Sequence, residues 1–216
     1  ADRDWSSDVC SSDLIGNSAG LSTLGAGSIA IGSNAGSSNN NAFSNAIAIG
    51  VAAGSNNQGT QTVAIGNYAG FTGQTLSAVA IGTAAGSNTQ GNYGIAIGAA
   101  AAQTSQGTNA IAIGVNAGTT SQASNAVAIG AVAGNISQQS NAVAIGYYTG
   151  YTGQTVHAVA IGTYAGSNAQ GNYGVAIGGN AGQTSQTANS IAIGYQAGSN
   201  TQGTGGSGAI AIGYQS

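Results

Sequence analysis

The chain has 216 residues, of which only 2% are charged, and its formal net charge is −3. The one Arg and the four Asp all lie within residues 1–14, so residues 15–216 contain no Asp, Glu, Lys or Arg. We therefore expect no enzyme activity, no metal or cofactor and no nucleic-acid partner, because acid–base catalysis, metal binding and phosphate neutralisation need charged or ligating side chains.

Residues 1–14 share no pattern with the remainder of the chain. They also hold the only Trp and the only Cys, Trp5 and Cys10. The run from Asp4 to Leu14 resembles a sequencing-library adapter translated in frame. We therefore expect a non-native segment at 1–14 and a single repeat domain at 15–216, which is a fragment without capping repeats.

From residue 15 onward, an Ile-Gly pair recurs thirteen times, and ten of the twelve intervals between these pairs are 16 residues. A fixed period of this size is typical of stacked repeats that bury their faces against one another. No apolar run approaches the length of a membrane-spanning helix, so we expect this segment to make no membrane contact.

One unit, residues 109–124, shows how a coil is built. Residues 110–113 alternate Ala with Ile, which is typical of a strand. Gly114 and Gly118 then allow turns, and the polar segment 119–122 follows before the next unit. The pattern predicts an all-β chain, a parallel β-solenoid of about twelve coils, with Val and Ile stacked inside and a length of ~55–60 Å at roughly 4.8 Å per coil.

Each strand is apolar on both faces, and such strands are usually covered on both sides. With Val and Ile inside, the Ala row faces outward, and its small side chains would let a neighbouring subunit approach closely. We therefore expect a side-by-side oligomer packed through Ala112, Ala128, Ala144, Ala160 and Ala176. The alternative is that these Ala residues are simply small and tolerate solvent.

A Gln recurs with the same period, eight residues after ten of the thirteen Ile-Gly glycines. Stacking would place these side chains in one column, where amides can hydrogen-bond from coil to coil. We expect a structural ladder of Gln58, Gln74, Gln90, Gln106, Gln122, Gln138, Gln154, Gln170, Gln186 and Gln202. The two longer intervals carry insertions at 39–44 and 204–208, in the polar half of the coil.

Aromatic residues gather in two adjacent coils. Tyr147, Tyr148, Tyr151 and Tyr164 lie close in sequence to His157, and Tyr68 with Phe71 occupies the matching coil 80 residues earlier. On a surface of small uncharged residues, these rings form a candidate contact surface. The alternative is that Tyr fills space at the turns and stacks on Tyr from the next coil.

The string Asn-Ala-Val-Ala-Ile-Gly, at 125–130 and 141–146, resembles the head repeat of trimeric autotransporter adhesins, the YadA-like heads. Related strings occur in bacteriophage tail fibres. The resemblance implies a left-handed parallel β-roll, a homotrimer, and an extracellular fibre that missing regions would anchor in a bacterial outer membrane. It also implies an adhesive role. We expect a glycan or a host-surface protein as ligand, because the aromatic rings of the candidate contact surface can stack on sugars or on a partner protein.

Two alternatives to the adhesin remain open at this stage. A bacteriophage tail-fibre shaft on a virion would use the same repeat. An ice-binding solenoid would need a regular Thr ladder on one face. The position six residues after each glycine carries Thr in some coils but Asn or Ile in others, as at Thr104, Asn88 and Ile136.

Overall fold

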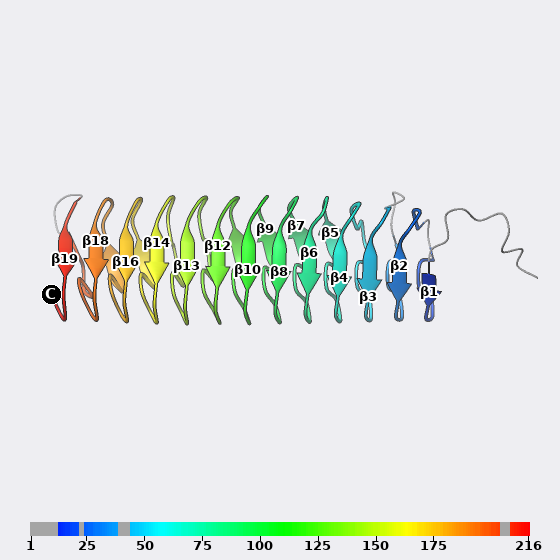
Figure 1. Cartoon of the computed structure of the whole chain (residues 1–216), viewed down its shortest axis with the longest axis horizontal. Coiled ribbons are helices and arrows are strands. Elements are labelled where there is room, and N and C mark those ends of the chain that lie inside the picture. Colours follow the sequence, from blue (N-terminus) through cyan, green and yellow to red (C-terminus); the bar gives the residue numbers. More distant parts are fainter. Residues whose placement is uncertain (1–12, 22–23, 39–43, 204–207) are drawn as a thin grey trace, which may run out of the picture.

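The computed structural model describes residues 13–21, 24–38, 44–203 and 208–216. Within these ranges the chain forms strands and turns and no helix, and it winds as a regular solenoid along one long axis (Figure 1). Residues 1–12 and most of the two insertions, residues 39–43 and 204–207, lie outside the described residues.

One parallel sheet of 13 strands runs the length of the solenoid, one strand per coil. Each residue pairs with its equivalent in the next coil, as Val127 pairs with Val143. The predicted parallel β-solenoid is thereby confirmed. In order, the strands are β1 (Asp13–Ile15), β2 (Ile29–Ile31), β3 (Ile47–Ile49), β4 (Val63–Ile65), β6 (Val79–Ile81), β8 (Ile95–Ile97), β10 (Ile111–Ile113), β12 (Val127–Ile129), β13 (Val143–Ile145), β14 (Val159–Ile161), β16 (Val175–Ile177), β18 (Ile191–Ile193) and β19 (Ile210–Ile212).

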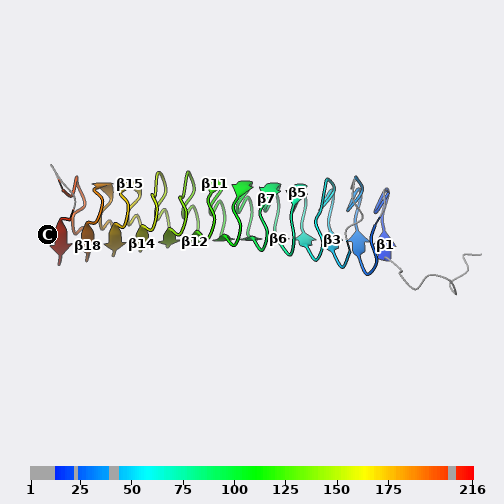
Figure 2. The same ribbon diagram turned by 90° about the horizontal axis from the view of Figure 1, so that it is seen from above.

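A second, polar layer lies on the opposite side of the solenoid (Figure 2). It consists of a four-stranded and a two-stranded parallel sheet, and isolated bridges such as Thr120 to Ile136 extend the same alignment between them. The strands are β5 (Thr72–Gln74), β7 (Asn88–Gln90), β9 (Thr104–Gln106), β11 (Thr120–Gln122), β15 (Asn168–Gln170) and β17 (Thr184–Gln186).

The first strand begins two residues before the expected domain boundary. Asp13 and Leu14 belong to β1 and pair with Ile29 and Ala30 of β2. The register of the sheet therefore extends into the segment that the sequence assigned to 1–14.

The core lies between the two layers and consists mainly of alanine. The central Ala of the long-sheet strands is fully buried from β2 to β18. A second Ala column, from the turns that follow these strands, is buried beside it, with Thr149 in place of Ala after β13. The prediction that the Ala rows form a subunit interface is wrong: Ala112, Ala128, Ala144, Ala160 and Ala176 are all 0% exposed inside the solenoid.

The Val and Ile residues point the other way. Both flanking positions of each strand from β2 to β18 are only partly covered, and Ile145 is 36% exposed. The prediction that Val and Ile stack inside is therefore also wrong. A coil of 16 residues with two three-residue strands encloses a narrow interior, in which Ala on one side fits against a Gln side chain from the other.

The Gly of each Ile-Gly pair is required by the turn that ends the strand. Gly114 has a φ of 133°, and a Cβ placed on it would lie 2.6 Å from the Gly130 carbonyl oxygen of the next coil. Real Cβ atoms do not approach backbone oxygens so closely, and L-residues rarely adopt that φ. This contact explains why the pair recurs in every coil.

Each coil also turns through left-handed positions that are not glycine. One such column precedes the long-sheet strand and contains Asn109, Asn125 and Asn141, with φ of 56–60°. Asn tolerates this conformation better than most residues, because its short side chain hydrogen-bonds locally. The recurring Asn before the strand therefore fits the turn.

We expect Ala144→Lys to destabilise the solenoid strongly. The substitution would place an unpaired charge in the core, which costs several kcal/mol. In the urea unfolding of the full chain, the midpoint should fall sharply for Ala144→Lys and little for Gln139→Lys, whose side chain is exposed on the polar side. Equal midpoints for the two variants would show that Ala144 does not lie in the core.

Val132→Asn should stabilise the chain. Val132 has a φ of 62°, an unfavourable conformation for a β-branched residue, whereas Asn occupies the equivalent position at Asn116. Relief of this strain is expected to add about 1 kcal/mol to the free energy of unfolding. The reciprocal variant Asn116→Val should lose a similar amount, and a stabilising effect of that change would contradict the assignment.

Candidate functional site

The Gln column braces each coil across its interior. In all ten coils that carry this Gln, the side-chain Nε2 donates to the carbonyl of the first residue of the long-sheet strand, eleven residues earlier, at 2.7–3.2 Å. The Gln side chains are at most 6% exposed. Each amide therefore ties the polar layer to the apolar sheet from within the core.

Bonds between successive Gln residues extend this bracing along the stack. Six such pairs have Nε2 to Oε1 distances of 3.0–3.4 Å, including Gln122 to Gln138 and Gln138 to Gln154. No such bond joins Gln74 to Gln90, Gln90 to Gln106 or Gln170 to Gln186, and the Oε1 atoms of Gln90, Gln106 and Gln186 are buried without a hydrogen-bond partner. In two of these three gaps a glycine, Gly94 or Gly174, lies beside the amide where most other coils have Ala.

Gln138→Leu should destabilise the chain by about 2 kcal/mol, because it removes a buried donor and leaves neighbouring amides with fewer partners. The lost bonds would be those that Gln138 donates to the Val127 and Ala142 carbonyls and to Gln154, and the one that it accepts from Gln122. The adjacent Gln139 is exposed, so Gln139→Leu should change the free energy of unfolding by less than about 0.5 kcal/mol. If the two substitutions changed the free energy of unfolding equally, the buried Gln column would not be a source of stability.

The outer face of the long sheet presents two parallel rows of Val and Ile. Stacking at the strand spacing lets each side chain touch its equivalents above and below, so most are partly covered. In the middle of the solenoid, Ile113 and Ile145 are each 36% exposed. The two rows therefore form a continuous apolar face from β2 to β18. The sequence pattern predicts that Val and Ile lie inside the coil, so this face is on the opposite side of the strand from the one expected.

The aromatic cluster, defined as Tyr147, Tyr148, Tyr151 and Tyr164, forms on the turns that follow β13 and β14. Tyr148 stacks on Tyr164 of the next coil with ring centroids 5.3 Å apart and an interplanar angle of 25°. Tyr147 meets both rings edge to face, at 4.7 and 5.8 Å, and Tyr151 lies 5.2 Å from Tyr148. The structure therefore brings together all four rings that the sequence placed in one group.

Tyr147 is the most accessible of the four rings, at 48% exposed. Partial desolvation raises the pKa of its phenol above the ordinary value, and the neighbouring phenols of Tyr164 and Tyr148 raise it further. The hydroxyl of Tyr147 is therefore protonated at neutral pH and can donate a hydrogen bond.

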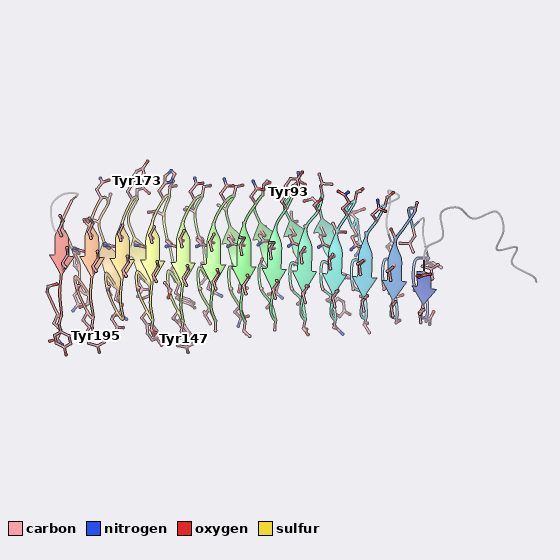
Figure 3. The ribbon with its side chains drawn as sticks, viewed as in Figure 1. Tyr93, Tyr147, Tyr173 and Tyr195 are labelled. Carbon is pink, nitrogen blue, oxygen red and sulfur yellow. The ribbon has the colours of Figure 1, made fainter. Side chains whose placement is uncertain are left out.

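The other aromatic residues form separate pairs. Tyr68 and Phe71 contact each other edge to face at 5.1 Å in the matching earlier coil. His157 stacks on Tyr173 at 5.1 Å, and Tyr195 stacks on Tyr214 at 5.5 Å. Figure 3 shows Tyr147 and Tyr195 on the rim where the strand arrows end, and Tyr93 and Tyr173 on the opposite rim. His157 and Tyr173 therefore lie apart from the cluster.

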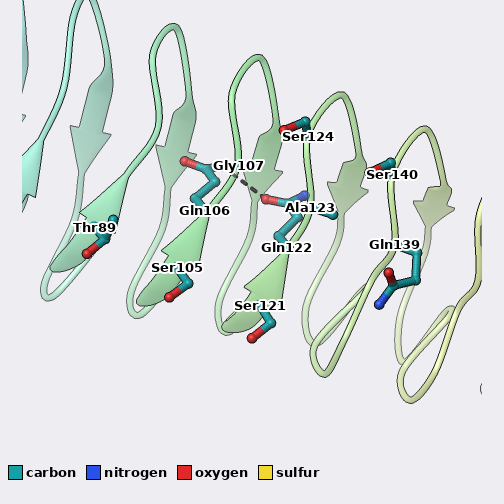
Figure 4. Close-up of a pocket in the computed structure, with 10 residues that line it drawn as sticks. All are labelled: Thr89, Ser105, Gln106, Gly107, Ser121, Gln122, Ala123, Ser124, Gln139 and Ser140. Carbon is teal, nitrogen blue, oxygen red and sulfur yellow. Dashed lines mark hydrogen bonds between the residues drawn. The ribbon is translucent and has the colours of Figure 1, made fainter.

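An open trough of about 440 Å³ lies on the polar side of the middle coils (Figure 4). Hydroxyls of Thr89, Ser105 and Ser121 line one wall, and Ser124 and Ser140 lie on the turns across from them. The trough offers neutral hydrogen-bonding groups but no aromatic ring and no charged group. Small polar residues occur at the same places in most coils, so the sequence pattern does not distinguish these residues.

The described residues contain no cluster of three His, Cys, Asp or Glu side chains that could hold a metal ion. Nor do they form any helix long and apolar enough to span a bilayer.

The polar strands align Thr104 with Asn88 on one side and Thr120 on the other, so the row is chemically mixed. A regular Thr ladder of the kind expected for ice binding is not formed by these strands.

Two segments, residues 105–133 and 188–216, match the family model described as the YadA head domain repeat. The first segment includes one copy of the Asn-Ala-Val-Ala-Ile-Gly string, at 125–130. The resemblance to a YadA-like head repeat is thereby confirmed for these parts of the chain. No curated protein and no solved structure matches the chain. The left-handed sense of the coil stays a prediction.

Proposed function

We propose that residues 15–216 form an adhesin-type segment of a surface-displayed fibre, in which three copies of the chain pack side by side. The solenoid places its coils in one uninterrupted stack, which is the shape of a shaft or an elongated head. The YadA head repeat found in two places supports the adhesin class.

The observation that carries this proposal is the outer face of the long sheet. Its two rows of Val and Ile are continuous from β2 to β18. An apolar face of this length is costly to leave in water. Packing against the same face of other copies would remove it from water. The interface of the proposed homotrimer therefore runs through Val and Ile, and not through the buried Ala rows.

The location proposed is extracellular, on a bacterial surface, with anchoring by regions outside this sequence. A bacteriophage tail-fibre shaft would present the same stack of coils on a virion. The adhesin is favoured because the matched family is an adhesin head repeat. In this proposal the segment acts as a rigid part of the fibre that presents a contact surface, and it does not act in catalysis.

Oligomeric state tests the proposal directly. Residues 15–216 should sediment at equilibrium with three times the mass of one chain at micromolar concentration. Val143→Lys would bury an unpaired charge in each interface and should weaken assembly by about 100-fold or more in dissociation constant.

The matched control is Gln139→Lys, which adds the same charge to the same coil on the exposed polar side. This variant should assemble like the parent chain, and far-UV circular dichroism should show both variants folded. A parent chain that stays monomeric and soluble would overturn the proposed assembly, as would a Val143→Lys variant that assembles normally.

A further inference from the structure

The aromatic cluster exists because the coil register stacks two turns directly on each other. The Tyr164 backbone N–H donates to the Tyr147 carbonyl at 3.0 Å, which joins the turn after β14 to the turn after β13. Beneath the rings, the hydroxyl of the fully buried Thr149 donates to the Gly162 carbonyl. Both bonds hold the two ring-bearing turns at a fixed separation.

The backbone conformation of the cluster is unusual for its residues. Tyr148 and Tyr164 have φ of 52° and 57°, in the left-handed region that bulky residues seldom occupy. Asn116 and Asn180 take the same position in other coils, where the conformation suits the residue. The same left-handed position recurs along the solenoid, for example at Ala84 and Val132, so the conformation belongs to the coil and sets where the two rings project.

The rings are ordered before any ligand arrives. Tyr148 lies between Tyr164 and Tyr151 with centroid distances of 5.3 and 5.2 Å, so the contacts on both sides restrict its rotation. Tyr147 stands nearly perpendicular to Tyr164, at 85°, and remains half exposed. A ligand that contacts Tyr147 would therefore meet a preorganised surface and lose little side-chain entropy on binding.

The chemistry of the cluster selects a class of ligand. Residues 15–216 contain no Asp, Glu, Lys or Arg, so an ionic ligand would find no counter-charge among the residues around the cluster. The cluster offers an aromatic surface with phenol hydroxyls at its edge, and the exposed Thr163 adds a further hydroxyl beside Tyr164. A sugar ring complements this surface, because its C–H groups pack on aromatic rings while its hydroxyls exchange hydrogen bonds with phenols.

We infer that the aromatic cluster is a binding site for a neutral glycan. The inference extends the proposed fibre function by naming a ligand class and a place for it, and it does not depend on assembly through the Val and Ile face. The site lies on the rim of the solenoid, where the turns project from the two layers (Figure 3).

The test compares glycan binding by the full chain and by three variants of it. The probes are immobilised neutral oligosaccharides of glucose, galactose, mannose and N-acetylglucosamine, each with a sialylated counterpart. The parent chain should bind a subset of the neutral probes. Tyr147→Ser should weaken that binding about tenfold, and the triple change Tyr147→Ser, Tyr148→Ser, Tyr151→Ser should abolish it.

The matched control is Tyr195→Ser. Tyr195 occupies the same position in its coil as Tyr147 and is also 48% exposed, but it stacks only on Tyr214. Binding by this variant should stay within about twofold of the parent, because the four-ring cluster is untouched. Circular dichroism and sedimentation on the same samples check that every variant is folded and assembled.

Four results would overturn the glycan site: no binding of any neutral probe by the parent chain, equal binding by Tyr147→Ser, preference for the sialylated probes, or an equal loss in Tyr195→Ser. Loss of assembly in the folded Tyr147→Ser variant would instead make the cluster a contact between copies of the chain, and would also overturn the inference. If the parent chain assembles but binds no glycan, the glycan site is wrong and the proposed fibre function is not contradicted.

Discussion

The hydrogen bond from a buried Gln amide to the carbonyl of the opposite strand is the interaction on which the coil depends. A coil with two short strands has little apolar side-chain volume of its own, and Ala contributes few contacts. The amide fills the space between the layers and donates to two carbonyls in most coils, as Gln74 does to Val63 and Ala78. Polar bracing thus supplements the small hydrophobic core.

The narrow interior decides which face of the strand is outside. Only the smallest apolar side chain fits opposite the Gln, so Ala128 turns inward while Val127 and Ile129 turn outward. The apolar area that the coil cannot enclose becomes a continuous surface. The same restriction that keeps the coil thin therefore produces the face through which copies are proposed to associate.

The turns link the fold to the proposed contact site. Each coil passes through several left-handed positions, and at Gly114 the close approach of the next coil leaves no room for a side chain. Where Tyr148 and Tyr164 occupy such positions, their rings are directed into one group with Tyr147 and Tyr151. A strict register thus converts residues 16 apart in sequence into direct neighbours.

The sequence by itself determined the period, the parallel stacking and the residues that share a column, because identical spacing forces equivalent residues into register. It also placed Tyr147, Tyr148, Tyr151 and Tyr164 in one group. Which face of the strand is buried depended on tertiary structure. Alternation of Ala with Val or Ile defines two faces, but only the width of the closed coil shows that Ala fits inside. The Gln bonds across the core likewise depend on how far apart the two layers lie, a distance that no residue spacing specifies.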